Sequence, residues 1–221
     1  MFKKKQRSAT VVGLDLDPSH IAAAEVHVNG SVTVKKGAVV ALRPGVLRDG
    51  EASDPAALAE ALRELFEAND LPKRVRLGIA NQRIVVRSLD LPVIDDPKGL
   101  AAAVQQEAPD HIPMPMDEAV VDVQSLGVVE TPVGPRSRVV IVAVRREMIE
   151  RLVSATREAG LELEGIDLAA FGMVRALAPA DAGNQAILYV NVAGLTNVAV
   201  ANGSGCLFTR AAAGGLDAVV H

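Results

Sequence analysis

Two pairs of apolar segments, one near each end of the chain, have the pattern of β-hairpins. The first pair consists of apolar runs at 11–16 and 21–28, separated by an Asp-Pro-Ser turn at 17–19. Short apolar runs bounded by such turn residues predict a strand, a tight turn and a second strand. The second run ends at an Asn-Gly pair, a favoured type I′ turn, which predicts a further hairpin into a strand at 32–40.

The same pattern returns late in the chain. An apolar run at 187–192 is followed by a small-residue turn and a second run at 198–201. The Asn-Gly pair at 202–203 then predicts a hairpin into 206–212. Because no short-period repeat is present, we expect a duplication in which two related halves each offer a turn to a shared cleft.

The segment after the first hairpins predicts the rest of a compact half. Residues 43–54 are rich in turn residues and predict a loop. Asp54 and Pro55 then predict the start of a helix to about Asn69, because Asp caps helices and Pro fits the first turn. A strand is expected at 75–80, and three strands, a helix and a fourth strand are typical of a ribonuclease-H-like unit.

The middle of the chain predicts a second, smaller unit. In order, it has a strand at 84–91, a helix from Asp96-Pro97 that Pro109 stops, strands at 119–129 and 139–144, a helix ending at Gly160 and a strand at 161–166. The order β-α-β-β-α-β is that of a ferredoxin-like subdomain. A helix at 167–178 and a linker at 179–185 would then lead to the late hairpin.

Several short motifs follow one another along the chain in a recognisable order. They are Gly13-Leu14-Asp15-Leu16, Ser19-His20-Ile21 and Glu25-Val26, and later Val190-Asn191-Val192, Thr196-Asn197, Phe208-Thr209-Arg210 and Gly214-Gly215. Between them lie Arg87-Ser88-Leu89-Asp90-Leu91-Pro92, Gln106-Glu107-Ala108, His111-Ile112-Pro113 and Asp167-Leu168. The outer motifs resemble those of the actin-like ATPase superfamily. With the middle set, the chain most resembles the PilM family, the cytoplasmic actin-like proteins of type IV pilus assembly and type II secretion-like machines.

The resemblance implies an α/β chain of actin-like architecture. Residues 1–81 and 167–184 would form a first actin-like (ribonuclease-H-like) half, and residues 82–166 an inserted ferredoxin-like subdomain, as PilM and its relative FtsA have at this place. Residues 185–221 would form an incomplete second actin-like half. Since a complete half needs further strands, several helices and an adenosine-binding glycine motif, we expect the chain to be truncated relative to the family.

The amino-acid composition and the net charge exclude some classes of function for this chain. The 221 residues are 49% hydrophobic but only 2% aromatic, and the net charge of −4 argues against nucleic-acid binding. The single cysteine, Cys206, is interpreted as a small packed hydrophobe and the four histidines have no metal-site spacing. Neither a signal peptide nor a stretch of about 20 apolar residues is recognised. A basic start, with Lys3, Lys4, Lys5 and Arg7, suits either an anionic membrane surface or a solvated, disordered end.

The resemblance also implies a nucleotide site between the two hairpin turns. The turns would clamp phosphates with backbone N–H groups, and carboxylates would hold Mg²⁺. The candidate residues are Asp15, Asp17, Ser19, His20, Asn191, Gly194, Leu195, Thr196, Gly214 and Gly215, with Asp15 as the Mg²⁺ residue. Taken alone, Asp15 is also explained as a turn former at a strand end.

Both turns depart from the family pattern. Asp17 stands where the family usually has Gly, and Pro18 lacks a backbone donor. In the second turn, Asn191 replaces the usual Asp and Ala193 the usual Gly. We therefore expect a degenerate site with weak or no binding of ATP and Mg²⁺.

Two classes of function follow. The first is a scaffold at the cytoplasmic face of the inner membrane, peripheral to it, that binds the cytoplasmic tail of a bitopic, PilN-like partner. The resemblance places that tail between the first half and the insertion, with 84–91 as one wall. Self-association through exposed apolar strands of the second half is a further expectation. The alternative is an actin-like ATPase or a small-molecule kinase, and the sequence leaves open whether the chain is an enzyme.

Overall fold

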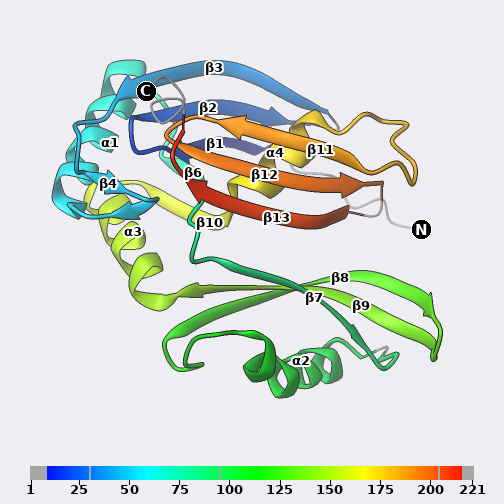
Figure 1. The fold of residues 1–221 in the computed structure, drawn as a ribbon. Coiled ribbons are helices and arrows are strands. Elements are labelled where there is room, and N and C mark those ends of the chain that lie inside the picture. The colour runs from blue at the N-terminus through cyan, green and yellow to red at the C-terminus, as the bar shows by residue number, and fades with distance from the viewer. Residues whose placement is uncertain (1–8, 30, 95, 204, 216–221) are drawn as a thin grey trace.

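The computed structural model describes residues 9–29, 31–94, 96–203 and 205–215 (Figure 1). The basic start at residues 3–7, Gly30 of the first Asn-Gly turn and His221 lie outside the described residues. The described chain folds into one five-stranded sheet, two three-stranded sheets and a short two-stranded hairpin, with four helices among them.

The first sheet has five strands in the order β10-β6-β1-β2-β3. Strands β1 (Ala9–Leu16), β2 (His20–Val28) and β3 (Val32–Ala41) are antiparallel neighbours, while β6 (Arg74–Ile79) and β10 (Glu162–Leu168) run parallel to β1. A short hairpin of β4 (Leu47–Arg48) and β5 (Glu51–Ala52) lies within the predicted loop.

One face of this sheet carries the main hydrophobic core. Val12, Leu14 and Leu77 alternate with small or polar residues along their strands and are buried against helix α1 (Pro55–Asn69) and helix α3 (Arg146–Glu158). The start of α1 is as predicted, because the Asp54 side chain accepts a hydrogen bond from the Ala57 amide at 3.0 Å. The opposite face of the sheet is left for the site described below.

The six predicted middle elements are present in order, but they do not form one ferredoxin-like unit. Strand β10 pairs with β6 in the first sheet, and α3 buries Met148 and Leu152 in the core beneath that sheet. The physical reason is that the apolar face of the first sheet must be covered by helices. The first sheet needs a second helix beside α1 on its apolar face, and the free edge of β6 accepts β10 as a parallel neighbour.

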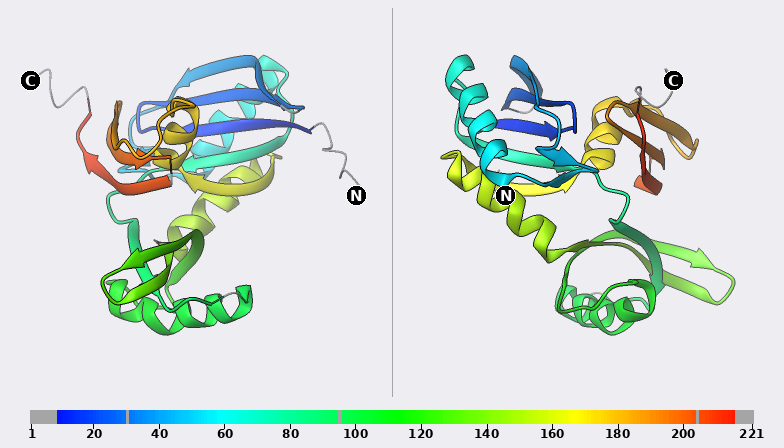
Figure 2. Two further views of the ribbon diagram at one scale, coloured as in Figure 1. Left: turned by 90° about the vertical axis from the view of Figure 1, so that its right-hand side faces the viewer. Right: turned by 60° about the vertical axis from the view of Figure 1, so that its left-hand side comes forward.

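The inserted unit is therefore smaller than predicted. Its sheet has the order β7-β9-β8, from β7 (Val85–Leu91), β8 (Ala119–Thr131) and β9 (Gly134–Arg145). One face packs on α2 (Pro97–His111), with Met114 and Met116 against the same core. The helix continues past Pro109 to His111, so the prediction that Pro109 stops it is wrong. Figure 2 shows the inserted unit projecting from the rest of the chain.

The late hairpins form a third sheet of β11 (Ile187–Val192), β12 (Leu195–Asn202) and β13 (Gly205–Ala213). Its inner face packs on α4 (Ala169–Leu177), which lies between this sheet and the first one (Figure 1). On the other face Leu188 is 63% exposed, Val190 52% and Phe208 52%. Val200, which pairs with Leu188 and projects from the same face, is half-buried, so the expected exposure of apolar strands holds for β11 more than for β12.

Candidate functional site

A pocket of about 970 Å³ lies on the face of the first sheet that α1 and α3 leave open. Small residues make its floor, since Gly13 of β1, Ala22 and Ala24 of β2 and Gly78 of β6 line it. Helix α4, Asn191 and Asn197 of the third sheet, and Asp122 and Gln124 of β8 close its sides. The pocket thus borders all three sheets.

Two carboxylates lie in one row across the floor. Asp15 pairs with Gly78, and Gly78 pairs in turn with Asp167 of β10. Directly paired residues project from the same face of a sheet, so both carboxylates flank the bare glycine. A Cβ at Gly78 would lie 3.7 Å from Asp15 Oδ1. Asp15, Gly78 and Asp167 all line the pocket.

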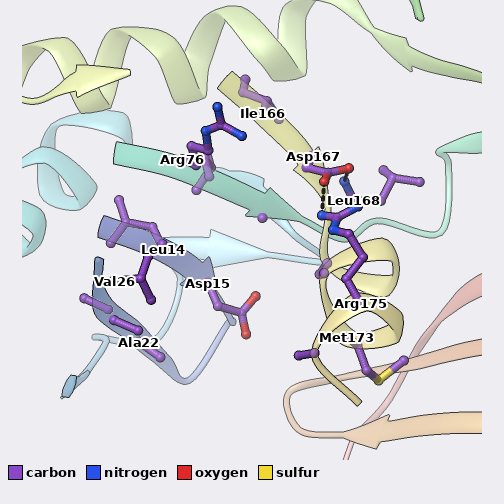
Figure 3. Close-up of a pocket in the computed structure, with 18 of the residues that line it drawn as sticks. Leu14, Asp15, Ala22, Val26, Arg76, Ile166, Asp167, Leu168, Met173 and Arg175 are labelled. Atoms are coloured by element: carbon purple, nitrogen blue, oxygen red, sulfur yellow. Dashed lines mark hydrogen bonds and ion pairs between the residues drawn. The ribbon is translucent and has the colours of Figure 1, made fainter. Parts of the chain in front are cut away.

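The two carboxylates differ in their surroundings. Asp167 is ion-paired with Arg175 of α4 and accepts a hydrogen bond from the Leu168 amide at 2.8 Å. Asp15 faces the pocket (Figure 3), where partial loss of hydration and the nearby Asp17 carboxylate raise its pKa, opposed by His20. Asp167 is thus neutralised by a partner, and Asp15 is the more available acid.

Sequence reasoning did not include Asp167 or Arg175 among the site residues. A pattern pointed to the first of them, because Gly165-Ile166-Asp167-Leu168 repeats the Gly-aliphatic-Asp-Leu order of Gly13-Leu14-Asp15-Leu16. The expectation of a helix from 167 hid this likeness, whereas the strand continues to Leu168. Arg175 carries no such pattern and is found only through the placement of α4.

The first turn carries a buried carboxylate. Asp17 is only 6% exposed. Its Oδ1 accepts hydrogen bonds from the Ser19 amide at 2.9 Å and the Ser19 hydroxyl at 2.6 Å. His20 Nδ1 lies 3.4 Å from the same oxygen and 3.0 Å from Ser19 Oγ. Three predicted site residues, Asp17, Ser19 and His20, are therefore joined in one cluster.

The second oxygen of Asp17 reaches the other hairpin. Asp17 Oδ2 accepts hydrogen bonds from the Gly194 amide at 2.7 Å and the Leu195 amide at 3.3 Å. Burial raises the pKa of Asp17, but the hydrogen bonds from Ser19 and Gly194 outweigh it, so the pKa is lowered overall. The two turns therefore meet, as predicted, and the Asp17 side chain makes the contact between them.

Close packing explains the glycines of the second turn. A Cβ on Gly194 would lie 2.3 Å from Asp17 Oδ1. Gly215, which is buried, packs against the backbone of the same turn, where a Cβ would lie 1.4 Å from the Ala193 carbonyl oxygen. The Thr196 hydroxyl donates to the Gly214 carbonyl at 2.8 Å. The structure places Gly214, Gly215 and Thr196 as supports of the turn, and Asn191 on the pocket wall.

The residues present do not fit a Mg²⁺–phosphate clamp as they stand. The backbone donors of the second turn that would meet a phosphate already bind Asp17. Of the two carboxylates in the row across the floor, Asp15 is the one that is not ion-paired among the described residues, and it could order water around a cation.

Comparisons with known proteins identify the family to which the chain belongs. A family model described as "Type IV pilus assembly protein PilM" matches residues 13–219. The chain is similar to a solved structure described as the "PilM-PilN type IV pilus biogenesis complex", with 28% identity and a TM-score of 0.81, over 94% of this chain and 62% of that chain. The predicted actin-like α/β fold class is thereby confirmed.

Two other solved structures match this chain at lower sequence identity. EutJ from Carboxydothermus hydrogenoformans matches with 17% identity and a TM-score of 0.48, covering 96% of this chain and 54% of that chain. MreB 5 of Spiroplasma citri bound to AMPPNP matches with 13% identity and a TM-score of 0.48, covering 92% and 52%. The chain thus spans about 62% and 54% of the first two solved chains it matches. None of the helices in the described residues is long and apolar enough to span a membrane.

Proposed function

Because the chain belongs to the PilM family of type IV pilus assembly proteins, we propose that it is a scaffold for the cytoplasmic tail of a PilN-like, bitopic inner-membrane protein. It would act in the cytoplasm at the inner face of the membrane, with a degenerate nucleotide site. The observation that carries the proposal is the likeness, at a TM-score of 0.81, to a chain solved in a PilM–PilN complex.

The proposed binding groove lies between the first sheet and the inserted unit. The face of the inserted sheet that does not pack on α2 carries Val86 and Ser88 on β7 and Gln124 on β8. Gln124 and the first-sheet residue Arg76 line the same pocket, so this face is turned toward the first half. The pocket therefore extends into the space where the resemblance places the tail.

Strand β7 has the features of a docking edge. It is an end strand of its sheet, so one side of its backbone is not paired within the sheet. Arg87, Ser88 and Asp90 are exposed along it, and they are interspersed with the buried residues Val85, Leu89 and Leu91. An extended tail that pairs with such an edge gains backbone hydrogen bonds, while neighbouring pockets read its alternate side chains.

A peptide titration with two matched variants tests the proposal. A fluorescent peptide with the cytoplasmic N-terminal sequence of the PilN-like protein encoded beside this gene is titrated into the chain. We expect saturable binding that a scrambled peptide lacks. Ser88→Trp should weaken it at least tenfold, because the indole fills the groove. Ser125→Trp, an exposed serine of β8 that projects from the other face, should bind like the unaltered chain.

Two results would contradict this function. The first is an absence of binding at hundreds of micromolar peptide by a chain with a cooperative unfolding transition. The second is equal weakening by both tryptophans. Steady ATP hydrolysis by the unaltered chain, abolished by Asp15→Ala, would instead support the ATPase alternative.

A further inference from the structure

The two hairpins are joined by one carboxylate. Asp17 and Gly194 are 177 positions apart, and their contact is 2.7 Å long. The carboxylate is buried, and four donors converge on it, three of them backbone amides. A surface turn that needs only to reverse the chain requires no contact of this kind.

The second turn has the properties of an anion-binding site. Two successive backbone amides, of Gly194 and Leu195, point at one oxygen, and such paired N–H groups form a concavity that binds anions. Gly194 has no side chain to shield them, and a Cβ there would fall where the carboxylate lies. The same geometry suits an oxygen of a phosphate group, which carries the same kind of charge and accepts the same hydrogen bonds.

We propose that Asp17 is the internal occupant of this anion site, and that a polyphosphate group binds the second turn once the Asp17 carboxylate is removed. The inference refines the altered nucleotide site of the proposed function and is independent of tail binding. It would account for the weak phosphate binding that the altered turns predict: the amides of the second turn are present, but the chain's own carboxylate accepts their hydrogen bonds. The aspartate thus replaces the ligand and also fastens the hairpins together.

Inorganic tripolyphosphate is the probe, and the full chain carries the substitutions. By calorimetry, we expect the unaltered chain to bind it negligibly at 1 mM and Asp17→Gly to bind it at least tenfold more tightly. Asp110→Asn, which removes an exposed negative charge at the end of α2, should behave like the unaltered chain. If Asp17→Gly and Asp110→Asn bind equally, the gain is only one of net charge, and the proposal is wrong.

A double variant tests where the ligand binds. Adding Gly194→Ala to Asp17→Gly puts a methyl group where the anion would lie, and the clash it makes in the unaltered chain is absent because the carboxylate is gone. We expect this double variant to lose the gained tripolyphosphate binding. Undiminished binding would place the anion elsewhere and overturn the inference.

The unaltered chain offers a test that does not depend on any variant folding. If Asp17 occupies the site, its protonation must weaken both hydrogen bonds to the second turn. In ¹⁵N-labelled protein, the amide resonances of Gly194 and Leu195 should therefore shift together with the Asp17 carboxyl carbon as the pH is lowered. Amide resonances that ignore the Asp17 titration would exclude the proposed occupancy. The readouts of both tests differ from peptide binding, so the failure of one proposal is distinguishable from that of the other.

Discussion

Asp15 of β1 and Asp167 of β10 lie in one row across the first sheet, with Gly78 of β6 between them. Each is the third residue of a Gly-aliphatic-Asp-Leu sequence, so the same local pattern delivers an acid to the same face of the sheet twice. Asp167 is ion-paired with Arg175 of α4, whereas no ion pair of Asp15 is found within the described ranges of the chain. The row therefore has one neutralised and one available carboxylate.

The available carboxylate is expected to cost stability at neutral pH. Because the pKa of Asp15 is raised in the folded protein, folding binds protons between the ordinary pKa of 3.8 and the raised one, and stability falls as the pH rises through that interval. Asp15→Asn should thus raise Tm by a few degrees at pH 7 and leave it unchanged below about pH 3.5. Differential scanning fluorimetry from pH 3 to pH 7 measures the Tm of the variant and of the unaltered chain. Asp110→Asn is the control. A gain of equal size at every pH would contradict the assignment to ionisation.

The bridging carboxylate should have the opposite effect. The pKa of Asp17 is lowered, so its contribution to stability is present above the ordinary value of 3.8 and is lost as the pH falls through the folded pKa. Asp17→Asn weakens four charge-assisted hydrogen bonds, and we expect a loss of about 1–3 kcal/mol at pH 7. Urea unfolding at pH 7 and pH 3 measures it. The difference in unfolding free energy between the variant and the unaltered chain should be smaller at pH 3 than at pH 7. A larger difference at pH 3 would be inconsistent with a lowered pKa of Asp17.

Support of the second turn by Gly215 is tested by adding one methyl group. Gly215→Ala places a Cβ 1.4 Å from the Ala193 carbonyl oxygen, and overpacking against backbone typically costs about 1–3 kcal/mol. Hydrogen exchange of the Gly194 and Leu195 amides should quicken, because the turn must move. The matched variant is Gly172→Ala within α4, where a Cβ meets nothing within 4 Å. That change should stabilise the chain by up to about 1 kcal/mol. Similar effects of the two alanines would refute the supporting role.

The third sheet is expected to open more readily than the rest of the chain. Its strands expose Leu188, Val190 and Phe208, so fewer apolar contacts hold them. Hydrogen exchange followed by mass spectrometry should show residues 187–213 exchanging well before residues 11–168. Leu188→Thr should reduce concentration-dependent association, because it removes an exposed apolar side chain from an edge strand. Equal protection of both regions would show that the exposed face has little effect on stability.

The local elements could be predicted because short-range physics decides them. Apolar runs bounded by turn residues predicted strands such as β1 and β2, and the Asp54 and Pro55 pair predicted the start of α1. The likeness of the two hairpins also followed from the order of apolar runs and turn residues. That likeness, with the intervening motifs, was enough to identify the family.

Only the tertiary structure decided which elements share a sheet and which groups meet. The order β-α-β-β-α-β fits one ferredoxin-like sheet as well as two sheets, and the choice depended on the free edge of β6 and the uncovered core beneath it. In the same way, the sequence predicts Asp17 to be a ligand-binding residue, because it lies in a turn. The structure shows instead that its carboxylate accepts a hydrogen bond from Gly194, 177 positions away. Contacts between distant segments depend on packing and on the space left by other elements, and neither quantity is written in the local pattern of residues.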